Sequence, residues 1–119
     1  MDREFLSHLD GPALTLLAWE LGLAPQHWTP IDKPWRPHED LAQADAVFRG
    51  LRAHGWNTAV EWYAPGAFGD ISASHGSHMI KITWGSGEDE TSEPLALLRC
   101  AVLARASEEE TTHAPTQNN

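Results

Sequence analysis

The chain has 119 residues, of which 41% are hydrophobic and 21% are charged, which is the composition of an ordinary globular domain. A chain of this length forms one hydrophobic core, so we expect a single domain. The 8 Lys and Arg residues against 17 Asp and Glu residues give a net charge of −9, which excludes a generally cationic surface.

The excess negative charge comes from two segments. These are the residues Glu88, Asp89, Glu90 and Glu93, and the residues Glu108, Glu109 and Glu110. The rest of the chain is near neutral, so we expect neither nucleic acid nor an anionic membrane as a partner. Because there is one cysteine, Cys100, and no leader or membrane-spanning apolar run, we expect a cytoplasmic protein.

The first predicted helix begins at Asp10, which is a good N-cap, and has Pro12 in its first turn. Its apolar stripe consists of Leu14, Leu17, Ala18 and Leu21. Gly22 is suited to a left-handed C-terminal cap, and Pro25 prevents the helix from continuing.

Residues 25–37 hold four prolines together with Trp28 and Trp35, which predicts an ordered connecting loop because the large indoles are costly to leave in water. A second helix is predicted over residues 37–54, closed by Gly55. Its apolar residues at helical spacing are Leu41, Ala44, Val47, Phe48 and Leu51.

From Trp56 the hydrophobic period changes to two, which predicts a half-buried strand to Tyr63. Trp56, Thr58, Val60 and Trp62 share one face of this strand. A second strand is predicted at residues 78–84, and residues 64–77 between the two are expected to form a long loop or an irregular hairpin. The acidic residues 88–92 are expected to form an edge strand.

The last predicted helix runs from Pro94 to about Ala106, and residues 108–119 are expected to be a disordered tail to a domain of residues 1–107. The fold class is therefore α+β, in the order α-α-β-β-β-α. Three helices supply more apolar stripe than one sheet face can cover. We therefore expect helices on both faces of a small antiparallel sheet of about three strands, an αβα sandwich.

Four short stretches of this chain resemble the phage α-β-α (ABA) sandwich domains. They are Leu9-Asp10-Gly11-Pro12-Ala13-Leu14, Trp35-Arg36-Pro37-His38-Glu39-Asp40, His54-Gly55-Trp56 and Glu93-Pro94-Leu95-Ala96-Leu97-Leu98-Arg99-Cys100. The last stretch is similar to a pattern in the NinX-like phage proteins. The resemblance covers most of residues 9–105.

The resemblance implies a phage-encoded anti-defence protein acting in the cytoplasm of a host bacterium. Some relatives are sponges that sequester an immune signal, such as the cyclic ADP-ribose isomer of the anti-Thoeris case, without catalysis. The resemblance therefore implies that the partner is a small nucleotide, in this case a cyclic one. It also implies no cofactor and no enzymatic activity. A homo-oligomer would account for the surplus of apolar helix surface.

Arg99 is the first candidate ligand-binding residue, because helical geometry places it between Leu95 and Leu103 rather than opposite the apolar stripe. A partly desolvated guanidinium presents a planar fork that suits a phosphate. The alternative is that Arg99 pairs with a carboxylate at a helix or subunit interface.

The tryptophans are the second group of candidates, because indoles stack on purine rings. Trp28 and Trp35 lie on the predicted loop, whereas Trp62 and Trp84 lie on predicted strands, where packing in the core is the alternative. His38, at the start of the second helix, completes the candidate set.

A metal site and an enzymatic mechanism are both disfavoured by the sequence. Asp70, His75 and His78 lie close together, but their spacing matches no metal motif, so we expect no metal. Cys100 has no evident base and is expected to be a small buried hydrophobe.

A second hypothesis is a protein that binds and inhibits a host effector. Trp28 and Trp35 with the acidic residues at 88–93 would form the contact surface, either by aromatic anchoring or by mimicry of nucleic-acid phosphates. The alternative interpretation of these acidic residues is that they protect an edge strand from pairing with another chain.

Overall fold

A computed structural model describes residues 3–23, 35–64, 68–85 and 92–113, and the structural statements below concern these residues. The elements in chain order are α1 (Arg3–Ser7), α2 (Gly11–Glu20), α3 (Leu41–Gly50), the 3-10 turn η1 (Leu51–His54), β1 (Asn57–Ala64), β2 (Phe68–His75), β3 (His78–Trp84) and α4 (Glu93–His113).

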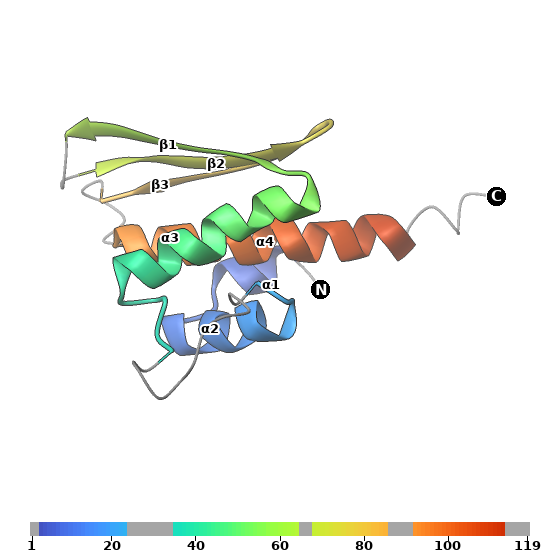
Figure 1. The fold of residues 1–119 in the computed structure, drawn as a ribbon, viewed down its shortest axis with the longest axis horizontal. Helices are drawn as coiled ribbons and strands as arrows, with labels where there is room; N and C mark the ends of the chain where they lie inside the picture. Colours follow the sequence, from blue (N-terminus) through green and yellow to red (C-terminus); the bar gives the residue numbers. More distant parts are fainter. Residues whose placement is uncertain (1–2, 24–34, 65–67, 86–91, 114–119) are drawn as a thin grey trace.

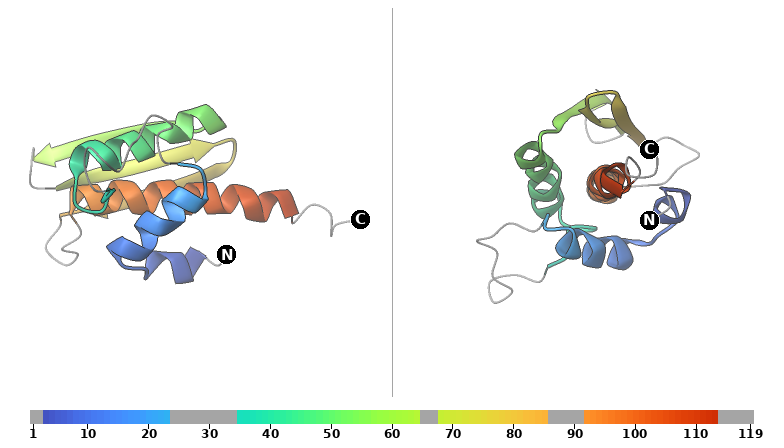
Figure 2. Two further views of the ribbon diagram at one scale, coloured as in Figure 1. Left: turned by 60° about the horizontal axis from the view of Figure 1, so that its bottom comes forward. Right: turned by 90° about the vertical axis from the view of Figure 1, so that its right-hand side faces the viewer.

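The three strands form one antiparallel sheet in the order β1-β2-β3. The prediction of an α+β fold with a three-stranded antiparallel sheet is confirmed. Helix α4 lies at the centre of the molecule, with the sheet on one side, α3 and α1 on opposite flanks, and α2 on the side away from the sheet (Figures 1 and 2). The other elements therefore surround α4.

The central position of α4 follows from its composition. Between Ala96 and Ala106 only Arg99 and Arg105 are not buried. A helix that is apolar all round must be enclosed, so α4 takes the sheet on one side and helices on the others. The buried side chains of the described residues form one continuous core.

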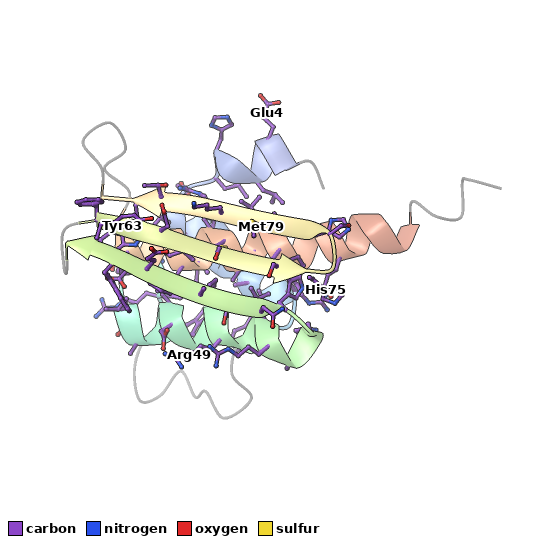
Figure 3. All side chains as sticks on the ribbon, turned by 90° about the horizontal axis from the view of Figure 1, so that it is seen from above. Glu4, Arg49, Tyr63, His75 and Met79 are labelled. Carbon is purple, nitrogen blue, oxygen red and sulfur yellow. The ribbon has the colours of Figure 1, made fainter. Side chains whose placement is uncertain are left out.

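The expectation that helices cover both faces of the sheet is wrong. No described helix lies over the outer face of the sheet, which Figure 3 shows from above. Along β2 the side chains Ile71 and Ala73 are buried against the helices, while Asp70, Ser72 and Ser74 on the outer face stay partly exposed. The surplus apolar surface of the helices is buried against α4 instead. Packing against a helix removes apolar surface from water just as packing against a sheet does.

The predicted strands at residues 56–63 and 78–84 are confirmed as β1 and β3, with β1 shifted by one residue. The interpretation of residues 64–77 as a loop or irregular hairpin is wrong over residues 68–75, which form the central strand β2. Gly76 and Ser77 make a two-residue hairpin turn with a φ of +61° at Gly76, where glycine is favoured. The edge strand predicted at 88–92 lies outside the described residues except for Ser92, which is not in a strand.

The capping of the helices fixes where they begin. The carboxylate of Asp10 accepts a hydrogen bond from the Ala13 N–H at 3.0 Å, as expected for an N-cap. Asp40 caps α3 in the same way, so this helix begins at Leu41 rather than at residue 37. The short helix α1 was not predicted.

Helix α4 continues to His113, so the prediction of a disordered tail is wrong for residues 108–113. The Arg105 guanidinium lies 3.4 Å from the Glu108 carboxylate one turn away, and each further residue adds a backbone hydrogen bond to an existing helix. Residues 114–119 lie outside the described part of the chain.

Candidate functional site

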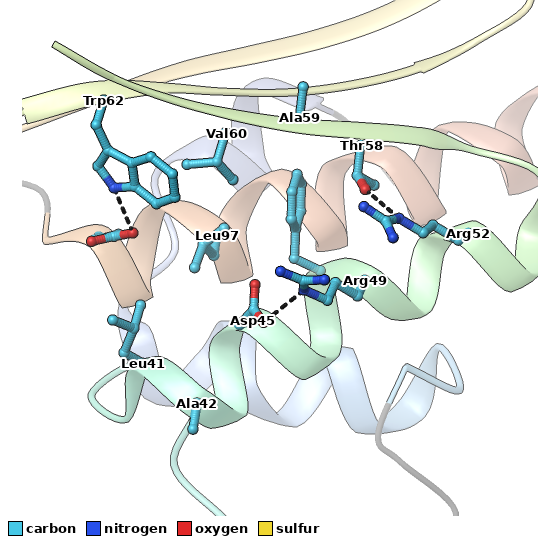
Figure 4. Close-up of a pocket in the computed structure, with 12 residues that line it drawn as sticks. Leu41, Ala42, Asp45, Arg49, Arg52, Thr58, Ala59, Val60, Trp62 and Leu97 are labelled. Carbon is cyan, nitrogen blue, oxygen red and sulfur yellow. Dashed lines mark hydrogen bonds and ion pairs between the residues drawn. The ribbon is translucent and has the colours of Figure 1, made fainter.

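A groove with a volume of about 680 Å³ lies between α3 and β1 (Figure 4). This volume is within the roughly 300–1,000 Å³ range of small-ligand sites. Its lining residues come from α3, η1, β1 and α4, and are Leu41, Ala42, Asp45, Phe48, Arg49, Arg52, Thr58, Ala59, Val60, Trp62, Glu93 and Leu97.

The groove exists because α3 packs on α4 rather than on the sheet. Strand β1 is an edge strand, so its free edge faces this space. Phe48 from α3 and Leu97 from α4 are both buried, and with Val60 of β1 they form an apolar floor. Ala42 lines the groove on the side of α3.

One end of the groove is cationic. The Arg49 Nε donates to the Asp45 carboxylate at 2.7 Å, and the Arg52 Nε donates to the Thr58 hydroxyl at 2.9 Å. Neither guanidinium uses its terminal nitrogens in a hydrogen bond to another described residue. Both groups project into the space between α3 and β1 (Figure 4), so their donor forks are open to a ligand.

The other end of the groove combines an indole with a carboxylate. Trp62 is 52% exposed, and its Nε1 donates to the Glu93 carboxylate at 3.2 Å. Thr58 and Trp62 are four residues apart on β1, which at about 3.3 Å per residue separates the two ends by roughly 13 Å. The groove is thus cationic at one end and aromatic and acidic at the other.

Of the residues predicted to bind a ligand that the structure describes, only Trp62 lines this groove. Arg99 is partly buried, as its helical position predicted, but its Nη2 donates to the Leu9 carbonyl at 2.8 Å and so ties α4 to the segment between α1 and α2. Trp84 is only 4% exposed and belongs to the core. Neither residue lines this groove.

Two further predicted site residues, Trp35 and His38, lie outside the groove. Trp35 makes an edge contact with Trp19 of α2, with ring centroids 6.0 Å apart. The His38 Nδ1 is 2.8 Å from the Thr15 hydroxyl, which joins the turn before α3 to α2. Trp28 lies outside the described residues. Of the predicted site residues that the structure describes, Trp62 is thus the one that lines the groove.

Arg49, Arg52 and Glu93 were missed by the sequence analysis. Arg49 and Arg52 are three residues apart and so share one helix face, which is a detectable signal. Nothing in the sequence places Glu93 opposite this pair, because that depends on how the sheet packs on α4, which brings Glu93 to Trp62.

The structure also bears on metal binding, on the cysteine and on membrane insertion. Among the described residues there is no group of three or more potential ligands that could hold a metal ion. Cys100 is buried. No helix within the described ranges is both long enough and apolar enough to span a membrane.

The outer face of the sheet carries a hydrogen-bonded cluster around Asp70. The Tyr63 hydroxyl and the Thr83 hydroxyl each donate to its carboxylate at 2.6 Å, and the Lys81 ammonium lies 3.5 Å away. These hydrogen bonds, first that from Thr83 and then that from Tyr63, lower the pKa of Asp70. The hydrogen bond to Asp70, followed by burial, raises the pKa of Tyr63 to about 12. The cluster joins all three strands.

Tyr63 is the single tyrosine of the chain, so its ionisation can be followed directly. We expect the tyrosinate absorbance to appear near pH 12 in the folded protein, and near the ordinary value of 10.0 in Asp70→Ala. Because the folded state favours the neutral phenol, its contribution to stability is complete below pH 10 and is lost as the pH rises toward 12. Thr83→Val leaves Asp70, the hydrogen-bond partner of Tyr63, in place and is the control. Ionisation near pH 10 while circular dichroism shows a folded protein would contradict this assignment.

Comparison with known protein families, with curated proteins and with solved structures found no match to this chain. The function must therefore be argued from the groove itself.

Proposed function

We propose that the protein is a non-enzymatic binding protein that sequesters a small nucleotide in the groove between α3 and β1. The observation that carries this proposal is the pair of open guanidinium forks, Arg49 and Arg52, at one end of an apolar groove that has an exposed indole at the other.

The cationic end suits a phosphate. A guanidinium donates two parallel hydrogen bonds to phosphate oxygens, and such charge-assisted bonds are stronger than neutral ones. Asp45 neutralises part of the charge of Arg49 but contacts only its Nε, which leaves the terminal nitrogens available. The whole chain is acidic, so the local pair supplies the attraction that the overall charge does not.

The other end suits a planar ring. The hydrogen bond to Glu93 holds the edge of the Trp62 indole and leaves its face available for stacking. Val60, Phe48 and Leu97 line an apolar floor between the two ends. A ligand that carries a ring at one end and a phosphate at the other matches this polarity.

The biological role we propose is capture of a nucleotide immune signal in the cytoplasm of a phage-infected bacterium, as the resemblance to the ABA sandwich domains implies. Large apolar side chains exposed on α1 and α2, namely Phe5, Leu16 and Trp19, support a homo-oligomeric assembly. Inhibition of a host protein remains the alternative. This alternative would use Trp28, Trp35 and the acidic residues at 88–93 as its contact surface.

Isothermal titration calorimetry with linear and cyclic nucleotides tests the proposal. Each hydrogen bond to a charged group contributes about 1.5–3 kcal/mol, so Arg49→Ala combined with Arg52→Ala should lower nucleotide affinity at least about 100-fold. Arg36→Ala, which removes an exposed cation outside the groove, is the matched control and should leave affinity unchanged. Absence of heat with every nucleotide, or an equal loss in the control, would overturn the proposal.

A further inference from the structure

We infer that Trp62 stacks on the base of the nucleotide and that Glu93 accepts hydrogen bonds from the edge of that base. The groove should therefore bind guanine nucleotides more tightly than adenine nucleotides. This inference rests on the proposed function, because it concerns the ligand of the same groove. The aromatic and acidic end of the groove would select guanine from among the nucleotides. The ligands that the resemblance implies contain adenine instead.

The position of Glu93 makes it suitable for this role. It is the first residue of α4 and lines the groove beside Trp62, half-buried at the end away from the two arginines. Its Oε2 accepts the Trp62 N–H, and it makes no ion pair with another described residue. Its other oxygen has no hydrogen-bond donor among the residues that the structure describes. A half-buried carboxylate with an open oxygen can therefore accept hydrogen bonds from a ligand.

The indole directs where the ring of the ligand lies. The Trp62 N–H lies in the plane of the indole and donates to Glu93, so a base stacked on the face of the indole would have its edge directed toward the same carboxylate. Stacking on an aromatic side chain tolerates every base, because all of them have a π-face. Selectivity must then come from the hydrogen bonds at the edge.

An ionised carboxylate only accepts hydrogen bonds. The Watson–Crick edge of guanine presents two adjacent donors, N1–H and the N2 amino group, which match the two oxygens of one carboxylate. Adenine presents one donor, the N6 amino group, beside the acceptor N1, whose lone pair would face a carboxylate oxygen. Hypoxanthine has the N1–H donor alone. The expected order of affinity is therefore guanine, then hypoxanthine, then adenine.

The other carboxylate of the groove does not compete for this role. Asp45 accepts the Arg49 Nε at 2.7 Å and lies at the cationic end, where the phosphate is expected. The separation of roughly 13 Å between Thr58 and Trp62, at about 3.3 Å per residue, places the base and the phosphate at different ends. Base selectivity thus depends on Glu93.

The test is calorimetric titration of the full chain with GMP, IMP and AMP, which share the same sugar and phosphate. The wild-type protein should bind GMP at least tenfold more tightly than AMP, with IMP between them. In Glu93→Gln one acceptor becomes an N–H donor, which complements adenine, so GMP affinity should fall about tenfold and the preference should disappear or reverse. The combined Arg49→Ala and Arg52→Ala variant should weaken all three nucleotides by a similar factor and retain their order.

The outcomes separate this inference from the proposed function. If GMP and AMP bind the wild type equally and the arginine variant weakens both, base selection is overturned and the proposed function stands. Retention of a tenfold GMP preference in Glu93→Gln also overturns the role of Glu93. If no nucleotide binds, both proposals fail. Circular dichroism of each variant establishes that the fold is intact.

Discussion

Leu98→Ala is expected to destabilise the protein by about 3 kcal/mol, since deletion of buried leucine side chains leaves a cavity as well as losing apolar burial. Leu98 is fully buried in α4, which contacts α1, α2, α3 and two strands of the sheet. The surroundings belong to several elements that would have to move together, so the cavity cannot easily collapse. Urea denaturation followed by tryptophan fluorescence measures the change.

Leu16→Ala is the matched control for Leu98→Ala. It makes the same chemical change on α2, where the Leu16 side chain is 62% exposed. We expect it to change the free energy of unfolding by no more than about 0.5 kcal/mol. Equal effects of the two substitutions would contradict the central position of α4.

Gly69→Ala is expected to destabilise the protein by about 2–3 kcal/mol, within the range for overpacking of a core. Gly69 pairs with Trp62 on one side and with Trp84 on the other, where the sheet faces the helices. A Cβ atom here would overlap the backbone carbonyl oxygen of Glu61 and lie 3.1 Å from the Trp84 Nε1. A backbone atom within a paired strand cannot move aside without disturbing the hydrogen bonds between β1 and β2.

Gly50→Ala tests the same substitution where there is room. The nearest atom to a new Cβ would be the Leu23 carbonyl oxygen at 3.7 Å, which is an ordinary contact, and Gly50 is the last residue of α3. Alanine favours a helix by up to about 1 kcal/mol over glycine, so we expect equal or greater stability. Thermal unfolding compares the two variants. A Gly69→Ala protein as stable as Gly50→Ala would contradict the close approach of Gly69 to the backbone of β1.

The local elements were predicted best where one chemical signal was sufficient. Asp10 caps its helix, and the alternation from His78 to Trp84 forms a strand with the predicted ends. The central strand was missed because Gly69, Ala73 and the serines around Ile71 have weak strand propensity by themselves. Pairing on both sides, with β1 and with β3, stabilises this segment and outweighs its composition.

The candidate site was less predictable than the fold. Trp62 was selected because indoles stack on bases, and the structure places it in the groove. Arg99 was selected because it interrupts an apolar stripe, but a carbonyl of the segment between α1 and α2 takes its guanidinium. A helical position predicts that a side chain is partly buried, whereas its partner depends on which element packs against it.

The sequence by itself determined the helix caps, the two strands with clear alternation and the α+β class, because each depends on residues near one another in the chain. Only the tertiary structure decided that α4 lies at the centre, that one sheet face stays uncovered, and that Arg49 and Arg52 face a groove which ends at Glu93. These features depend on contacts between segments far apart in the sequence. Such contacts are set by how the apolar surfaces of whole elements are best buried together, which no local pattern specifies.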